Sequence, residues 1–345
     1  MPTIYDLIEA PIIASYYNTM SQDRPPFLGE TLFPNRKKLG LDLAWIKGAA
    51  NTPVVLRPSA FDVEVMPRPR LGFSEIKTEM PFFKESKRLN EVDRQELNKV
   101  LEHPNPLYRD EILNRIFDDD TELLEAARTQ RERMRMSLLT TGMISIESNG
   151  VKLDYDYGMP SSHKITVTNK WTDTETSNPM ADIQKAQDLI EDEGNERPTR
   201  MIMNRYTWRL LFDSKMIKSN AFVMTNGVGF INDADMRGYL MRQTGITAEI
   251  YNKSYIDEKG TKHKYIPDGT VVLLPSGTLG STWLGTTPEE SDLMTGSAAN
   301  VAIVDMGVAI TTMKRVDPVN VETKVSMISL PSFELSDQIA ILDVV

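Results

Sequence analysis

The longest uninterrupted pattern of helix-forming residues lies between positions 105 and 142, and it predicts one long helix. No glycine or proline interrupts residues 107–141, which are rich in Leu, Glu, Arg, Met and Ala, and these residues lose little side-chain freedom in a helix. Pro106 fits the first helical position, and Gly142 fits a left-handed cap after the last one. About 36 residues at roughly 1.5 Å each predict a helix on the order of 54 Å long. We call residues 106–141 the spine helix.

Apolar residues recur along the spine helix at close to helical period, and we expect this stripe to face the core. Three consecutive aspartates at residues 118–120 are the one place where the pattern allows a break or a kink. The stripe predicts these core residues: Ile112, Ile116, Leu124, Ala127, Met134 and Leu138.

Residues 1–36 predict an N-terminal arm that is not one continuous helix. Short apolar clusters are followed by Pro-Pro and Phe-Pro steps, which disfavour a continuous helix or a central strand. The aromatic side chains of Tyr16, Tyr17 and Phe27 need a surface to pack against. Two alternatives are open. The arm folds back on its own core, or it crosses onto a neighbouring subunit, which makes these three aromatics candidate inter-subunit contacts.

Residues 40–86 alternate apolar and polar positions and predict a long two-stranded hairpin. Phe61 begins one such alternation, and the sequence PRPRLG at residues 67–72 predicts the turn at the tip. A lone hairpin is only marginally stable in water, so we expect this one to rest on a partner. Phe61 and the basic tip residues Arg68 and Arg70 are therefore candidate inter-subunit contacts.

The remaining sequence predicts a small hairpin, an α/β domain and two final strands. Residues 90–103 predict a short helix ahead of Pro104, and Asn149-Gly150 predicts a tight hairpin after the spine helix. Between about 175 and 310 we expect helices at 179–194, 204–214 and 233–245, strands at 199–204, 246–256, 263–266 and 270–275, and a strand or loop at 221–232. Apolar strands at 319–327 and 339–345 follow, and we expect the last to pair near the spine helix.

Composition and charge exclude several classes of protein. The 345 residues include no cysteine, so neither disulfides nor thiolate chemistry are available. A net charge of −10 argues against tight generic binding to nucleic acid, which depends on Lys and Arg. No run approaches the ~20 apolar residues needed to cross a bilayer. The first residues lack the pattern of a secretory signal.

A search for catalytic motifs is negative. The sequence has no phosphate-binding glycine loop, no H-E-x-x-H, no G-x-S-x-G and no paired cysteines. His103, His163 and His263 lie far apart in polar contexts, and we interpret each as structural or exposed. The aspartates at 118–120 point about 100° apart on a helix, so we interpret them as a solvated face. We predict no catalytic residue, no cofactor and no metal.

The order of these elements resembles the major capsid proteins of tailed bacteriophages, specifically the lambda-like major head protein family. The likeness rests on four stretches, residues 17–48, 118–160, 245–277 and 329–345. It implies an α+β chain with the Hong Kong 97-type phage capsid fold. In that fold residues 1–44 are the N-terminal arm, 45–86 the extended loop, 87–174 and 311–345 the peripheral domain, and 175–310 the axial domain.

The resemblance implies a structural function. The chain is expected to self-assemble into hexamers and pentamers that form the icosahedral head shell of the virion, built in the host bacterial cytoplasm. The shell encloses double-stranded DNA without sequence-specific binding, and scaffold, portal and decoration proteins are the implied partners, with no membrane. Two alternatives remain open: another phage structural protein such as a tail tube subunit, and a metal-dependent hydrolase.

Overall fold

The chain folds into two compact units whose segments alternate along the sequence. The computed structural model describes residues 9–21, 24–47, 74–89, 106–148, 150–224, 232–293, 299–316 and 319–345, with positions 91 and 95. Unit 1 contains Met1–Leu43, Lys77–Met134 and Gly280–Ser332, and unit 2 contains Ala44–Ile76, Arg135–Leu279 and Phe333–Val345.

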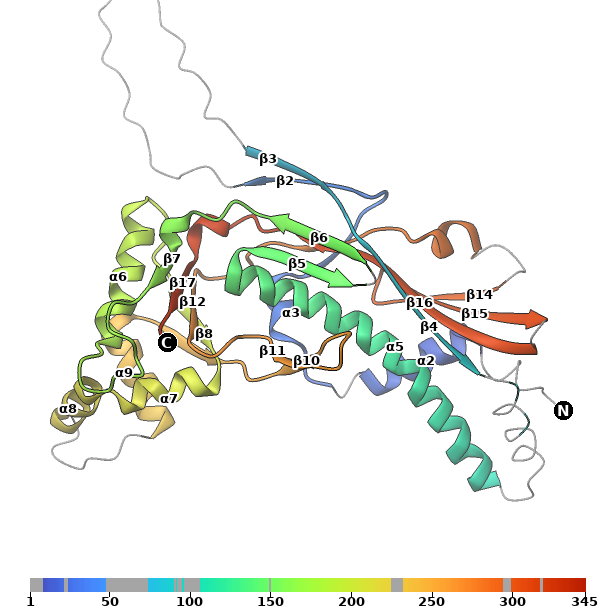
Figure 1. Cartoon of the computed structure of the whole chain (residues 1–345), viewed down its shortest axis with the longest axis horizontal. Helices are drawn as coiled ribbons and strands as arrows, with labels where there is room; N and C mark the ends of the chain where they lie inside the picture. The colour runs from blue at the N-terminus through green and yellow to red at the C-terminus, as the bar shows by residue number, and fades with distance from the viewer. Residues whose placement is uncertain are drawn as a thin grey trace, which may run out of the picture. The chain divides into compact units, whose positions relative to one another are not determined.

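The spine helix is present with the predicted bounds. Helix α5 runs from Pro106 to Thr141 over 36 residues and passes the three aspartates without a break (Figure 1). Gly142 ends it with a φ of 73°, and its N–H donates to Leu138 O at 2.8 Å. A glycine is required there, because only glycine adopts the left-handed region without strain.

Unit 1 is built on a six-stranded sheet. The order is β1-β13-β16-β15-β14, and β4 also pairs with β16. All pairs are antiparallel except β1 with β13. The strands are β1 (Asn35–Lys37), β4 (Phe82–Leu89), β13 (Thr282–Leu284), β14 (Asn300–Val304), β15 (Val308–Val316) and β16 (Val319–Pro331).

One face of this sheet forms the core of unit 1. Because side chains alternate along a strand, Val321, Val325 and Met327 of β16 share this face. They belong to one buried cluster with Leu124 of α5 and Tyr17 of helix α2 (Ala10–Ser21). A short helix α3 (Leu28–Leu32) and a π-helix η2 (Glu289–Leu293) complete the described helices of the unit.

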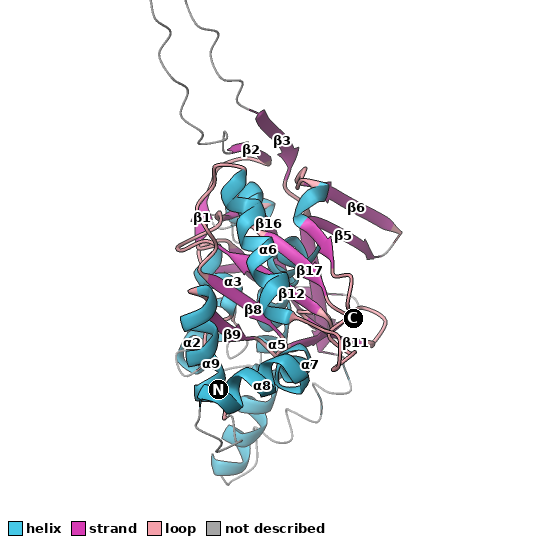
Figure 2. Cartoon of the chain, turned by 90° about the vertical axis from the view of Figure 1, so that its left-hand side faces the viewer, coloured by secondary structure: helices cyan, strands magenta, loops and turns pink. Residues whose placement is uncertain are grey.

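Unit 2 contains a five-stranded sheet in the order β7-β17-β12-β8-β9. Helix α6 packs on β17, and α9 packs on β9 (Figure 2). The strands are β7 (Lys164–Thr166), β8 (Arg200–Met203), β9 (Thr247–Ile250), β12 (Thr270–Leu274) and β17 (Ala340–Asp343). The helices are α6 (Pro179–Asp192), α7 (Arg205–Asp213), α8 (Lys215–Met224) and α9 (Asp233–Thr244), with 3-10 turns η1 (Ser161–His163) and η3 (Ser336–Gln338).

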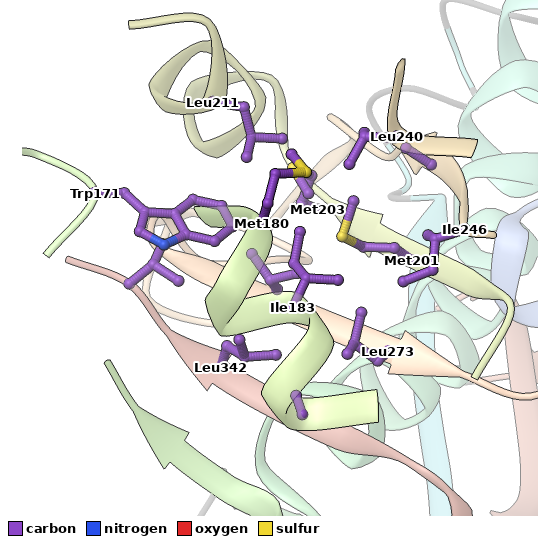
Figure 3. Packing of buried hydrophobic residues seen from close by; sticks show 14 of the residues in the cluster. Trp171, Met180, Ile183, Met201, Met203, Leu211, Leu240, Ile246, Leu273 and Leu342 are labelled. Atoms are coloured by element: carbon purple, nitrogen blue, oxygen red, sulfur yellow. The ribbon is translucent and has the colours of Figure 1, made fainter. Parts of the chain in front are cut away.

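Side chains from three strands and one helix meet in the core of unit 2. Ile183 of α6 lies over Met201 of β8, Leu273 of β12 and Leu342 of β17 (Figure 3). The predicted helix starts hold, because Asn178 accepts from Ala181 N and Asn204 accepts from Thr207 N as N-caps.

Three two-stranded hairpins accompany the larger sheets. The predicted hairpin is present, because β5 (Met143–Ser148) pairs antiparallel with β6 (Val151–Asp156) and Gly150 before β6 has a φ of 75°. The pair β2 (Asp42–Lys47) with β3 (Ser74–Glu79) forms the base of the long predicted hairpin, whose tip lies outside the described residues. The third pair is β10 (Ser254–Ile256) with β11 (Lys262–Lys264).

Two element predictions are wrong. Residues 221–224 form the end of helix α8 rather than a strand or loop. Strand β17 pairs with β12 and β7 in the five-stranded sheet instead of near the spine helix. The reason is that a short apolar run indicates burial but not its partner.

The compact units also group the chain differently from the predicted domains. Residues 280–310 lie with unit 1, and residues 135–174 and 333–345 lie with unit 2. Strand β14 pairs with β15 in the sheet of unit 1, which accounts for the first of these differences. In the described part of the chain, no helix has the length and apolar character of a membrane span.

Candidate assembly surfaces on the arm and the spine helix

The described part of the N-terminal arm packs on its own chain, which is the first of the two alternatives. Tyr17 is buried, and its hydroxyl donates to Glu125 of α5 at 2.9 Å. Burial, together with the charge of Glu125, raises the pKa of Tyr17 well above its ordinary value. Tyr16 lies 5.5 Å from Phe117 between ring centres and donates to Asp118 at 2.9 Å. Helix α2 is thus attached to the spine helix through both tyrosines.

A second attachment follows at α3, and we call Phe27, Glu30 and Arg128 the arm clasp. Arg128 of α5 donates to both carboxylate oxygens of Glu30, at 2.8 and 3.1 Å. Its guanidinium lies 4.7 Å from the centre of the Phe27 ring, a geometry that attracts a cation to a ring face. The Glu30 hydrogen bond raises the pKa of Arg128, against the effect of burial. The charged guanidinium is therefore paired with the Glu30 carboxylate.

Buried charges on the next turn of the helix contact both the arm and the β14–β15 turn. Glu132 is fully buried and accepts from Gly29 N at 3.1 Å. Arg131, also buried, forms an ion pair of 2.8 Å with Asp305 of the β14–β15 turn. Arg24 forms a further ion pair with Glu125. Sequence reasoning missed these residues, because charged helix positions are normally solvated and their partners lie far away in the chain.

The arm clasp gives a first testable prediction. Glu30→Gln removes the charge from a bidentate pair and should weaken the arm attachment by about 1–2 kcal/mol, since hydrogen bonds to charged groups are the stronger ones. Hydrogen exchange of the amides at residues 27–33 is expected to become several-fold faster. Glu175→Gln breaks an exposed ion pair with Lys215 and should change exchange little. Unchanged exchange in Glu30→Gln would contradict a stabilising clasp.

The aspartate triplet is not a uniformly solvated face, which corrects the interpretation from the sequence. Asp118 and Asp119 are exposed, but Asp120 is only 6% exposed. It lies against β16, where the Thr323 hydroxyl donates to it. Burial raises its pKa to about 6, although the Thr323 hydrogen bond and the charge of Lys87 act in the opposite direction. Within the described residues, no group of carboxylates and histidines is arranged to hold a metal.

Asp120 gives a prediction about pH. Its pKa is about 6 in the folded chain against an ordinary 3.8, so its charged form destabilises the fold at neutral pH and this cost is relieved as pH falls through 6. Two pKa units correspond to about 3 kcal/mol at most. Asp120→Asn should therefore raise the free energy of unfolding at pH 8 by about 1–3 kcal/mol and leave it nearly unchanged at pH 4. Urea unfolding at both pH values measures this, with Asp119→Asn as the control. Equal gains at pH 4 and pH 8 would refute the assignment.

Two further buried carboxylates connect the strands of unit 1. Glu322 of β16 accepts from Ser86 of β4 at 2.9 Å and forms ion pairs with Arg88 and Arg315, on β4 and β15. Burial opposes ionisation, but these partners together lower the pKa of Glu322. Glu289 of η2 is held in the same way by Lys324 and Ser326 of β16. Because the pKa of each carboxylate is lower in the folded chain than its ordinary value, both stabilise the sheet at pH values above the ordinary pKa. This contribution is lost as the pH falls through the lowered pKa of the folded chain.

The remaining predicted residues fall into two groups. Leu124, Ala127, Met134 and Leu138 of the spine helix are buried. The side chains of Ile112 and Ile116, and all of Phe61, Arg68 and Arg70, lie outside the described residues. The inter-subunit contacts predicted for Phe61, Arg68, Arg70, Tyr16, Tyr17 and Phe27 stay predictions.

The described histidines do not form a catalytic arrangement. His163 is buried and bonds through Nε2 to Glu193 at 2.8 Å. His263 is exposed at the β10–β11 hairpin and bonds to Asp257 at 2.8 Å. Each histidine therefore has a local carboxylate partner, and neither is paired with the other. His103 lies outside the described residues.

The fold is that of phage capsid proteins. It is similar to the putative capsid protein of a prophage of Escherichia coli CFT073, with a TM-score of 0.53 and 17% identity over 79% of this chain and 80% of the other. A phage-related protein of Bordetella bronchiseptica RB50 has a TM-score of 0.54 and 10% identity over 97% of each chain. The capsid of Cyanophage A-1(L) has a TM-score of 0.51 and 10% identity over 93% of this chain and 92% of the other. The α+β, Hong Kong 97-type fold class predicted from the sequence is confirmed.

Sequence comparison defines the family. Residues 10–344 match the phage major capsid protein E family, and the chain belongs to it. The major head protein derived from prophage P21 in E. coli O6:H1 and the major capsid protein of Enterobacteria phage P21 are each 28% identical over 233 residues. This match covers 64% of the present chain and spans 63% of the length of those relatives. The predicted resemblance to phage major capsid proteins is confirmed.

Proposed function

We propose that the chain assembles as a major capsid protein into the hexamers and pentamers of an icosahedral phage head shell. The observation that carries this proposal is the family match over residues 10–344. The shell encloses the double-stranded DNA genome and is part of the virion. Sedimentation of the purified chain tests the proposal, because assembly produces large particles, whereas a slowly sedimenting monomer at all concentrations would oppose it.

The arrangement of elements supports a function based on geometry rather than catalysis. Each subunit makes many modest contacts, and the repetition of these contacts over a shell gives a stability that no single contact has. Contacts that close around an axis build rings, and rings tile a shell. The alternatives differ in outcome, since a tail tube subunit would form tubes and a metal-dependent hydrolase would act as a monomer.

The domain assignment is part of the proposal. Residues 1–44 are the arm, 45–86 the extended loop, and the five-stranded sheet with its helices is the axial domain. The grouping of the compact units supports moving residues 280–310 to the peripheral domain and residues 135–174 and 333–345 to the axial domain. The axial domain then comprises residues 135–279 and 333–345, and the peripheral domain comprises 87–134 and 280–332.

Partners follow from the same proposal. Scaffold, portal and decoration proteins are separate chains that would contact the shell, and the DNA is enclosed without sequence-specific binding. The net charge of −10 supports this last point, because an acidic chain does not adsorb DNA strongly. DNA can therefore enter and leave without being held by the shell.

The basic tip predicted at Arg68 and Arg70 gives a test of the extended loop. We expect the tip to meet acidic groups of a neighbouring subunit, so Arg68→Glu with Arg70→Glu should lower the assembly yield and the melting temperature of shells. A double change to lysine keeps the charge and serves as the control. Wild-type yield and melting temperature in the glutamate variant would exclude this contact.

A further inference from the structure

The β10–β11 hairpin is anchored to unit 2 through one of its faces. Its pairing places Tyr255 opposite His263, and these two rings stack at 5.5 Å between centres. The Tyr255 ring also lies 5.1 Å from the ring of Tyr265, which lies 5.9 Å from that of Tyr251. Tyr251 and Tyr265 are buried. The row of rings therefore runs from two buried side chains out to the hairpin and fixes which face points inward.

The opposite face of the hairpin is exposed and basic. Because side chains alternate along a strand, Ile256 and Lys262, which pair across the hairpin, share this face. Ile256 is 69% exposed, and Lys262 and the turn residue Lys259 are exposed as well. In the part of the chain that the structure describes, neither lysine has a carboxylate partner, whereas Lys264 is paired with Asp268. We call Ile256, Lys259 and Lys262 the basic face.

The end of helix α6 and the segment after it carry the opposite charge. Five carboxylates and a single arginine lie between residues 188 and 197. Arg197 donates to both Asp188 and Glu191 and joins them into one surface. Asp192 lies one turn after Asp188 on the same side of the helix, is exposed, and has no cationic partner among the described residues. We call Asp188, Glu191 and Asp192 the acidic end.

The position of Asp192 is unfavourable in a chain on its own. It is the last residue of α6, and the last turn of this helix contains no basic residue. The carbonyl end of a helix dipole is negative, so a carboxylate there is repelled and a cation is attracted. A positive group supplied by another chain is therefore stabilised at the acidic end.

The two charged surfaces lie at opposite ends of the five-stranded sheet. The acidic segment leads into Arg200, the first residue of β8, and Glu196 accepts from the Ser276 hydroxyl in the loop after β12. The hairpin lies beyond Met203, the last residue of β8, whose carbonyl accepts from Tyr251 N at 2.9 Å. Each copy of unit 2 thus presents opposite charges at the two ends of one sheet.

We propose that the basic face of the β10–β11 hairpin docks on the acidic end of α6 in a second copy, an inference that rests on the proposed function. The unpaired lysines of one copy meet carboxylates that Arg197 neutralises only in part. Because the two surfaces differ, the contact is heterologous and runs head to tail, and its repetition closes a ring. Like ends repel, so charge complementarity also fixes the direction in which copies meet.

Charge reversal at each surface tests the contact. Lys262→Glu and Asp192→Lys should each raise the protein concentration needed for half-assembly about five-fold or more at low salt, because repulsion replaces attraction. The variant with both changes again has opposite charges across the contact and should need a concentration about two-fold or more below that of either single variant. Lys218→Glu reverses an exposed lysine of α8, changes the net charge as Lys262→Glu does, and should assemble as wild type. Light scattering of the purified chains measures all four variants.

Melting of the unassembled chain separates this contact from a folding defect. Asp192→Lys places a cation at the carbonyl end of α6, so it should raise the melting temperature by about 1–3 °C while it weakens assembly. A residue with a purely structural role would change stability and assembly in the same direction.

The outcomes also separate the contact from the proposed function. Wild-type assembly of Lys262→Glu, an equal loss in Lys218→Glu, or a double variant no better than the poorer single variant overturns the contact alone. Failure of the wild-type chain to form shells under any condition overturns the proposed function and the contact together.

Discussion

Replacement of Leu124 by aspartate is expected to prevent the chain from folding. Leu124 is 2% exposed and belongs to the cluster in which the spine helix, helix α2 and the six-stranded sheet meet. An unpaired carboxylate in this position costs about 3–5 kcal/mol. That is a large part of the roughly 5–15 kcal/mol that stabilises a typical domain. Insoluble expression and loss of native circular dichroism are the expected readouts.

The control lies half a turn away on the same helix. The side chain of Glu122 is 71% exposed and forms a surface ion pair with Lys87, so Glu122→Ala should cost less than about 1 kcal/mol. Soluble Leu124→Asp protein with a native-like spectrum would contradict the burial of this stripe. Leu138→Asp, at another buried position of the helix, is expected to fail in the same way.

Gly280→Ala is expected to be the most damaging single-methyl change. A Cβ at this position would lie 2.1 Å from the carbonyl oxygen of Ser332 and 3.3 Å from the buried ring of Phe33. The backbone cannot yield easily, because Ser332 N donates to Ser281 O at 2.7 Å. The added methyl group should therefore lower the free energy of unfolding by about 3 kcal/mol, as measured by urea unfolding.

Gly238→Ala is the matched control for this change. The nearest atom to its added Cβ is 3.7 Å away, at the end of the flexible Arg242 side chain. Since Gly238 lies inside helix α9, alanine should stabilise the chain by about 0.5–1 kcal/mol. Equal stability of Gly280→Ala and wild type would contradict the close approach of the two segments.

Local signals were sufficient to predict several elements. The bounds of the spine helix follow from Pro106, Gly142 and the absence of glycine and proline between them. The starts of α6 and α7 follow from Pro179 and from the capping residue Asn204. These signals act within a few residues of the chain, which is why they can be recognised without knowledge of tertiary structure.

Pairing between distant segments could not be predicted in the same way. Strand β1 pairs with β13 across some 250 residues of chain, and β17 joins a sheet whose other strands are distant in sequence. An apolar run such as residues 339–345 indicates that it is buried, but several edges would bury it equally well. The six-stranded sheet was therefore predicted only through fragments of β4 and β16.

The candidate site was the least predictable part. Arg128 and Glu30 are 98 positions apart, and nothing near either residue indicates the other. Asp120 differs from its neighbours Asp118 and Asp119 only in facing β16. A charged residue on a helix is normally solvated, so burial of Arg131 and Glu132 had no sequence signal. Of these residues, Arg128 and Glu132 attach the arm to the spine helix, whereas Asp120 and Arg131 contact the six-stranded sheet and its β14–β15 turn.

Electron microscopy in negative stain tests assembly most directly. The chain is expressed alone and then together with the other head proteins of its phage, and the purified fractions are imaged. Closed shells, or rings of six and five subunits, are the expected result. A monodisperse monomer under both conditions, with no particles, would contradict the assignment of this chain as a shell-forming capsid protein.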